Sequence, residues 1–139
     1  FSYLFECLDI PNIITIWHAL ALERQILVTS TQLSLLTISC EIILSLLYPL
    51  RWTHAYIPVL PRFMTPILSA PMPYLCGLDK RDLNHSLSDL SGECIVVDLD
   101  TNQVTLGPST KPLPPIPIHL KKELENKLVQ NTGMIFREA

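Results

Sequence analysis

Apolar residues in the first thirty positions change from a helical to a strand-like pattern. The segment "IPNIITIWHALALERQ" holds apolar residues at the three- and four-residue spacing of an amphipathic helix, with Pro11 in its first turn. These apolar positions are Ile13, Ile16, Trp17 and Leu20. The run "QILVTS", residues 25–30, is short, continuous and rich in branched side chains. It predicts a strand that is buried on both faces of a parallel sheet.

The next segment, "LSLLTISCEIILSLLYPL", permits two structural interpretations. Ser30 or Thr31 is expected to cap a helix over these residues. The stretch Leu33–Leu50 is also about long enough to span a bilayer. Glu41 lies near its centre, however, and a carboxylate at mid-bilayer is costly. A helix buried against a sheet is therefore favoured over a transmembrane helix.

Two further strands with short helices after them are predicted in the middle of the chain. "HAYIPVL" predicts a strand, and Pro58 must lie at a strand end or on an edge because it lacks an amide hydrogen. "PRFMTPILSA" predicts a short helix with Pro61 at or near its first position. "PYLCGL" predicts the third strand, which Gly77 ends, and "DKRDLNHSLSDLSGE" predicts a short helix and a loop.

The rest of the chain predicts a hairpin, a connector and a helix. "CIVVDLDTNQVTL" predicts strands at Cys94–Leu99 and Gln103–Leu106, joined by a turn in which Asp and Asn bond their own backbone. Residues 108–117 hold five prolines and predict a stiff connector, with a ligand for an SH3-type groove as the alternative. Residues 118–139 begin as an amphipathic helix. The predicted divisions are thus residues 1–107, 108–117 and 118–139.

The order of these elements predicts an α/β fold. It indicates a mostly parallel sheet of about five strands with helices on both faces, in three layers. The composition is 48% apolar and 17% charged, with a mean hydropathy of +0.32. About a quarter charged is typical of a soluble domain, so we expect a partial domain whose apolar faces meet other parts of the same chain. The net charge of -3 gives no indication of a nucleic-acid partner.

Residues for catalysis or metal binding are sparse in this sequence. The cysteines Cys7, Cys40, Cys76 and Cys94 form no C-x-x-C pair and are expected to be reduced, mostly buried thiols. Asp98 and Asp100 form a D-x-D pair that could share a divalent metal, but they enter a turn and no third ligand is suggested. The four histidines lack zinc spacing, and the four glycines form no phosphate-binding loop. We therefore predict no metal, no cofactor and no catalytic residue.

Several segments, taken in their order, closely resemble the central module of the DENN domain. They are "FECLDIPNIITIWHALALERQILVTSTQLSLLT", "LLYPLRWTHAYIPVLP", "SAPMPYLCGL" and "CIVVDLDTNQV", and the resemblance covers roughly Leu4 to Leu106. The matching positions are Ser30, Ser34, Trp52, His54, Tyr56, Ile57, Pro58, Leu60, Pro61, Pro71, Pro73, Tyr74, Gly77, Asp98 and Asp100. Thr29 departs from the pattern, because the family often has histidine there. Trp52 is interpreted as a packing residue, and His54 as a structural residue whose ring could hydrogen-bond to a neighbouring loop.

The resemblance implies a larger protein and a function. A complete DENN domain also has an upstream longin-like module and a downstream module, and "MIFREA" resembles the start of the latter. The family implies a guanine nucleotide exchange factor for Rab-family small GTPases that binds the switch regions and the nucleotide-free state. It further implies a cytoplasmic protein that partners recruit to vesicle or organelle membranes. The alternative is a non-catalytic scaffold or adaptor in a membrane-trafficking complex.

Interface residues are predicted at the carboxyl ends of the strands. In open α/β sheets, ligands tend to meet those ends. The candidates for contact with the GTPase are Thr31, Gln32, Arg62, Asp79 and Lys80. The alternative is that the same positions are ordinary loops. The core side chains Tyr56, Ile57, Leu60, Pro73 and Tyr74 are expected to support this surface without touching the GTPase.

Overall fold

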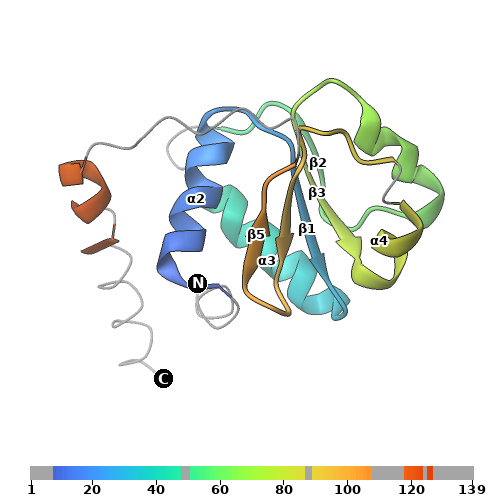
Figure 1. The fold of residues 1–139 in the computed structure, drawn as a ribbon, viewed down its shortest axis with the longest axis horizontal. Helices are drawn as coiled ribbons and strands as arrows, with labels where there is room; N and C mark the ends of the chain where they lie inside the picture. The colour runs from blue at the N-terminus through green and yellow to red at the C-terminus, as the bar shows by residue number, and fades with distance from the viewer. Residues whose placement is uncertain (1–7, 48–50, 87–88, 108–117, 124, 127–139) are drawn as a thin grey trace.

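The elements of the computed structural model follow the predicted order (Figure 1). The structure describes residues 8–47, 51–86, 89–107, 118–123 and 125–126. Its elements are α2 (Ile10–Ala21), β1 (Ile26–Ser30), α3 (Leu33–Ser45), β2 (Ala55–Ile57), the 3₁₀ helix η1 (Arg62–Ser69), β3 (Tyr74–Asp79), α4 (Lys80–Ser86), β4 (Ile95–Asp98) and β5 (Gln103–Thr105). Residues 118–123 are also helical. The proline-rich connector and the end of the terminal helix lie outside the described residues.

The five strands form one sheet in the order β2-β3-β1-β4-β5. All neighbours are parallel except β4 and β5, which form the antiparallel hairpin. Ile26 of β1 pairs with Leu75 on one side and with Ile95 on the other. Every residue of β1 is buried, as its apolar run predicted. The predicted mostly parallel sheet is confirmed.

Helices cover both faces of this sheet (Figure 1). Ile26 and Val28 of β1 belong to a core with α2 and α3, whereas Leu27 belongs to a second core beneath η1 and α4. This alternation follows from the strand, since successive side chains point to opposite faces. The three-layer α-β-α prediction is therefore confirmed.

The helix α3 lies against the sheet. Its buried side chains are Leu36, Ser39, Cys40 and Ile43. Glu41 is exposed and accepts a 2.8 Å hydrogen bond from the hydroxyl of Tyr56 on β2. Burial of Tyr56, followed by this hydrogen bond, raises the pKa of the phenol above its ordinary value. Among the described residues, none of the helices has the length and apolar character that a bilayer crossing requires.

Two local predictions were wrong. Neither Ser30 nor Thr31 caps α3, because the N-cap position belongs to Gln32, whose side chain makes no capping hydrogen bond. Gly77 does not end the third strand, because β3 continues to Asp79. The glycine is needed for a different reason: a Cβ there would lie 2.0 Å from the carbonyl oxygen of Pro58.

The predicted turn of the hairpin is confirmed and is tied to α2. Asn102 adopts a left-handed conformation with φ of 54°, which Asn tolerates better than most residues. Its side-chain oxygen accepts hydrogen bonds from the backbone N–H of Asp9 (2.9 Å) and from the side chain of Asn12 (3.0 Å). Asp9 in turn caps α2 by accepting from the Asn12 backbone N–H. The turn therefore fixes the start of α2 against the sheet.

The family-motif aromatic residues before β2 make local contacts. The indole N–H of Trp52 donates a 3.0 Å hydrogen bond to the Ala55 carbonyl, and its ring packs edge-on against His54 at 5.1 Å. His54 Nε2 lies 3.2 Å from a carboxylate oxygen of Glu23, in the loop after α2. Of the predicted core side chains, Leu60 and Tyr74 are buried, whereas Tyr56, Ile57 and Pro73 are half-buried.

We predict that the buried thiols do not react in the folded protein. Cys40, Cys76 and Cys94 are free and buried, and burial is the main cause that raises their pKa to about 12, 12 and 11. The thiolate is the reacting form, so at pH 8 a soluble thiol reagent should leave all three unmodified. The measurement is the number of thiols titrated in a Cys7→Ser variant, without and with denaturant. Rapid modification of the folded variant would contradict this burial.

Candidate functional site

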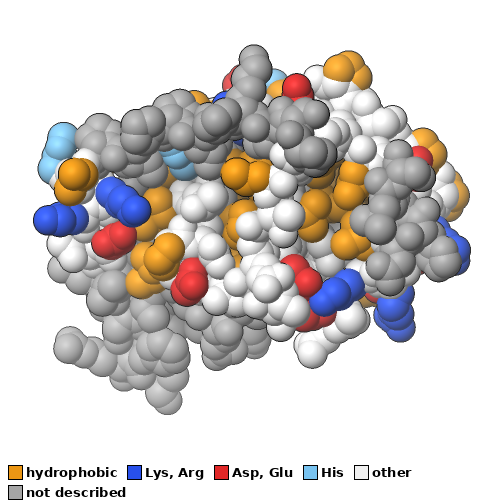
Figure 2. Space-filling model, viewed as in Figure 1, with side chains coloured by type: hydrophobic (Ala, Val, Ile, Leu, Met, Phe, Trp, Pro, Cys, Tyr) orange, Lys and Arg blue, Asp and Glu red, His pale blue; other side chains and the backbone are white. Residues whose placement is uncertain are grey.

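Polar side chains gather where β1, β3 and β4 end. These strands are parallel neighbours, and their register places Ser30 beside Asp79 and Thr29 beside Asp98. In Figure 2, acidic and basic side chains lie together at this lower edge of the molecule, below the apolar side chains near the β4–β5 hairpin. We call this the carboxyl edge, and its members are Ser30, Thr31, Gln32, Asp79, Lys80, Arg81, Asp98 and Asp100.

Asp100 joins the hairpin to the loop after β1. One oxygen of its carboxylate accepts a hydrogen bond from the Ser30 hydroxyl (2.9 Å), and the other accepts from the Thr31 backbone N–H (3.0 Å). The Ser30 hydroxyl accepts from the backbone N–H of Gln32 (3.1 Å). Ser30 itself is fully buried at the end of β1. These bonds fix the path of the chain from β1 into α3.

Lys80, the first residue of α4, connects the end of β3 to the β4–β5 hairpin. Its Nζ lies 2.9 Å from Asp98 Oδ2 and 4.0 Å from Asp100 Oδ2. Burial acts to raise the pKa of Asp98, but the hydrogen bonds from Lys80 and from the Asp100 backbone outweigh it, so this pKa is lowered. The stabilisation that ionised Asp98 provides is therefore present above the ordinary carboxylate pKa and is lost as the pH falls through the lowered one.

Arg81 is held at the surface by Asp79. The guanidinium and the backbone N–H of Arg81 donate to the Asp79 carboxylate at 2.9–3.1 Å. The side-chain hydrogen bond from Arg81 is the largest cause that lowers the pKa of Asp79. The Arg81 side chain is 73% exposed, so it remains accessible to a partner. Sequence reasoning did not select Arg81, although its spacing of two residues from Asp79 was a usable signal.

The structure brings together four of the five predicted interface residues. Thr31 and Gln32 are exposed beside the hairpin turn, and Asp79 and Lys80 occupy the adjacent strand end. Arg62 begins η1 and is exposed, but within the described residues it takes no part in the hydrogen bonds and ion pairs of the carboxyl edge. It follows β2, the edge strand, which pairs with β3 but not with β1 or β4.

The carboxylates of the D-x-D pair are engaged by protein groups. Asp98 binds Lys80, and Asp100 binds Ser30 and Thr31. No group of three or more potential ligands is arranged for a metal ion in the described part of the chain. The exposed groups that remain at the edge are the side chains of Thr31, Gln32 and Arg81. Such an arrangement provides a rigid, mixed-charge surface that can bind another protein.

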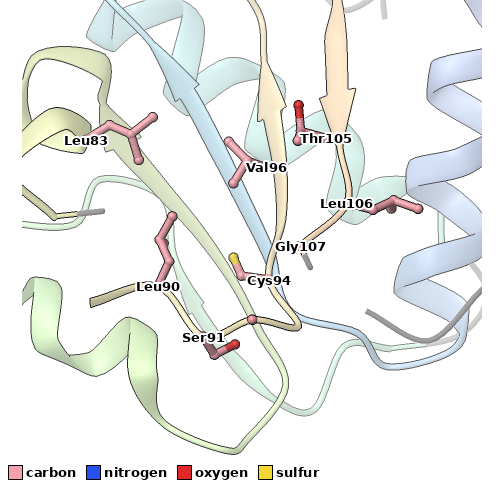
Figure 3. A pocket seen from close by; sticks show the side chains of 9 residues that line it. Leu83, Leu90, Ser91, Cys94, Val96, Thr105, Leu106 and Gly107 are labelled. Atoms are coloured by element: carbon pink, nitrogen blue, oxygen red, sulfur yellow. The ribbon is translucent and has the colours of Figure 1, made fainter. Parts of the chain in front are cut away.

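An apolar pocket of about 410 Å³ opens between α4 and the hairpin (Figure 3). Leu83, Leu90, Cys94 and Val96 converge on it. Its polar lining is slight, and the hydroxyl of Ser91 already bonds the Gln25 side chain. A small-molecule site usually has a few convergent polar groups. The carboxyl edge is therefore the stronger candidate for the functional site.

Comparison with known proteins identifies relatives over most of the chain. The family profile described as the DENN (AEX-3) domain matches residues 1–102. DENN domain and WD repeat-containing protein SCD1 of Arabidopsis thaliana is 38% identical over 127 residues, which are 91% of this chain and 10% of that protein. DENN domain-containing protein 1B of Mus musculus is 38% identical over 128 residues, or 89% of this chain and 16% of that protein.

A further relative gives the same result over a shorter range. DENN domain-containing protein 2A of Homo sapiens is 36% identical over 99 residues, or 71% of this chain and 10% of that protein. The chain therefore spans only 10–16% of the length of these relatives. The profile and the relatives agree with the resemblance seen in the sequence motifs, and the chain belongs to the DENN (AEX-3) domain family.

Proposed function

We propose that this chain is the central lobe of a guanine nucleotide exchange factor that promotes GDP release from a Rab-family small GTPase. The proposal combines the family membership with the geometry of the carboxyl edge. The lobe would bind the switch regions of the GTPase and favour its nucleotide-free state. Other parts of the same protein, including longin-like and downstream DENN modules, would complete the interface.

Exchange of this kind depends on coupled binding equilibria. A protein that binds the nucleotide-free GTPase more tightly than the GDP-bound form must, by linkage, weaken GDP binding by the same factor. The required part is a surface that holds the switch regions away from the magnesium and phosphate pocket. No covalent step is involved, so exchange requires binding surfaces and no acid, base or nucleophile.

The observation that carries the proposal is the fixed geometry of Thr31 and Gln32. Their backbone N–H groups are bound by Asp100 and Ser30, while both side chains are exposed. The neighbouring Lys80 and Arg81 add positive charge that is anchored by carboxylates. A preformed edge loses little conformational entropy when it binds a partner. We further propose a cytoplasmic protein that its partners bring to vesicle or organelle membranes.

We expect the full-length protein to accelerate the release of fluorescent GDP from one or more members of a Rab panel. A Thr31→Ala/Gln32→Ala variant should lower kcat/KM roughly tenfold, or about 1.4 kcal/mol, which is more than most interface residues contribute but less than a hot spot. Thr53→Ala is the matched control, because Thr53 is exposed just before β2, at the opposite end of the strands. The 139 residues alone should show little or no activity, since much of the interface is missing.

The panel also separates this proposal from the alternative. If no Rab releases GDP faster, the exchange function is wrong. Stable binding of trafficking proteins without exchange would then favour a scaffold or adaptor. Robust exchange by the 139 residues alone would show that the central lobe needs no further module.

A further inference from the structure

Asp100 accepts hydrogen bonds from a loop that is far from it in the sequence. Ser30, whose hydroxyl it binds at 2.9 Å, lies 70 positions earlier in the chain. The same carboxylate accepts a hydrogen bond from the Thr31 backbone N–H at 3.0 Å. The Ser30 hydroxyl in turn accepts a hydrogen bond from the Gln32 N–H at 3.1 Å. One side chain of the hairpin turn is thus bonded directly to the Thr31 N–H and, through the Ser30 hydroxyl, to the Gln32 N–H.

These bonds lie at the start of α3, where Gln32 occupies the N-cap position and makes no capping hydrogen bond. The first N–H groups of a helix lack partners within it, and the Ser30 hydroxyl accepts from one of them, the Gln32 N–H. Thr31 precedes the N-cap, so the bond from its N–H to Asp100 holds the loop and does not cap the helix. Without the Asp100 carboxylate, the Thr31 N–H would have to donate its hydrogen bond to water. The Ser30 hydroxyl would lose the acceptor that orients it.

The exposed side chains of this loop are available for contact. Thr31 and Gln32 are exposed, and neither side chain has a hydrogen bond to another described residue. The Asp100 side chain is only 22% exposed, and Lys80 lies 4.0 Å from it. Its carboxylate is therefore largely covered where it meets the loop and Lys80, although the residue as a whole is exposed in the turn.

We propose that Asp100 is a positioning residue of the GTPase-binding edge: it holds Thr31 and Gln32 in the binding conformation and does not itself touch the GTPase. The inference rests on the proposed exchange function and adds the residue that fixes its contact loop. Its physical basis is preorganisation, since a loop that is already ordered loses less entropy on binding. Asp98 and Lys80 complete the support by fixing the neighbouring strand end.

The test is Asp100→Asn in the full-length protein. Asparagine keeps the shape but removes the charge, and at the position where its NH2 group replaces a carboxylate oxygen it can donate but cannot accept the bond that Ser30 or Thr31 donates there. We expect kcat/KM for GDP release to fall roughly tenfold, the size of one hydrogen bond to a charged group. Hydrogen exchange at the Thr31 and Gln32 amides should become roughly tenfold faster by the same argument.

Two controls distinguish positioning from general destabilisation. Asp89→Asn makes the same chemical change in a carboxylate that accepts a 3.0 Å hydrogen bond from the Thr65 hydroxyl but lies outside the carboxyl edge; it should change neither quantity. In a Gln32→Ala background, Asp100→Asn should cost less than it does alone, because it acts through that loop. Fully additive effects with a lowered Tm would indicate a merely structural role and overturn the inference.

The outcomes also separate this inference from the proposed function. If the wild type releases GDP and Asp100→Asn releases it equally fast, the inference is wrong and the function stands. If the wild type acts on no Rab, the function fails, and with it the role of Asp100 toward a GTPase. Amide exchange of Thr31 and Gln32 still decides the loop contact itself: unchanged exchange in Asp100→Asn would show that the carboxylate does not hold the loop.

Discussion

Replacing Gly77 with alanine should destabilise the domain by about 4 kcal/mol or more, enough to prevent folding if its stability is ordinary. The added Cβ would lie 2.0 Å from the Pro58 carbonyl oxygen and 3.1 Å from Cγ of Leu36. The first contact is with the backbone of the connection that follows the edge strand β2. In the same connection, the Leu60 N–H donates a 2.7 Å hydrogen bond to the Gly77 carbonyl. The urea midpoint and the soluble yield measure the effect.

The controls identify which contact is responsible. Val59→Ala changes an exposed neighbour of Pro58 in the same connection and should alter stability by less than about 0.5 kcal/mol. Combining Gly77→Ala with Leu36→Ala removes the side-chain contact but leaves the backbone clash, so it should not restore stability. A Gly77→Ala variant with a wild-type midpoint would mean that the Pro58 connection does not lie against β3 as described.

The fold could be predicted where the cause is local. The run "QILVTS" specifies a strand buried on both faces, and Asn102 specifies a turn, because both effects act within a few residues. Gly77 could not be interpreted in this way. Its role comes from the carbonyl of Pro58, which the parallel pairing of β2 and β3 brings onto it.

The candidate site could likewise be predicted from the sequence only in part. The rule that ligands meet strand ends selected Thr31, Gln32, Asp79 and Lys80, which the sheet order brings to one edge. It also selected Arg62, which begins the 3₁₀ helix after the edge strand β2 and stays a prediction. The bond between Ser30 and Asp100 spans 70 positions, so local capping rules could not find it.

Leu36→Ala should lower the free energy of unfolding by about 2–5 kcal/mol, the usual range for a leucine removed from a packed core. Leu36 is fully buried between α3 and the sheet, and its Cγ would be 3.1 Å from a Cβ on Gly77. Truncation therefore leaves a cavity next to Gly77, which has no side chain to fill it. The urea midpoint and Tm of the purified protein measure this loss.

Leu33→Ala provides the matched control, because it makes the same chemical change in the first turn of the same helix. Leu33 is 45% exposed, so its truncation should alter stability by less than about 0.5 kcal/mol. Helix propensity changes equally in both variants, so the difference between them isolates burial. Equal effects would show that α3 does not present Leu36 to the sheet. The carboxyl edge would then lose its basis as well, since α3 continues directly from the Thr31–Gln32 loop.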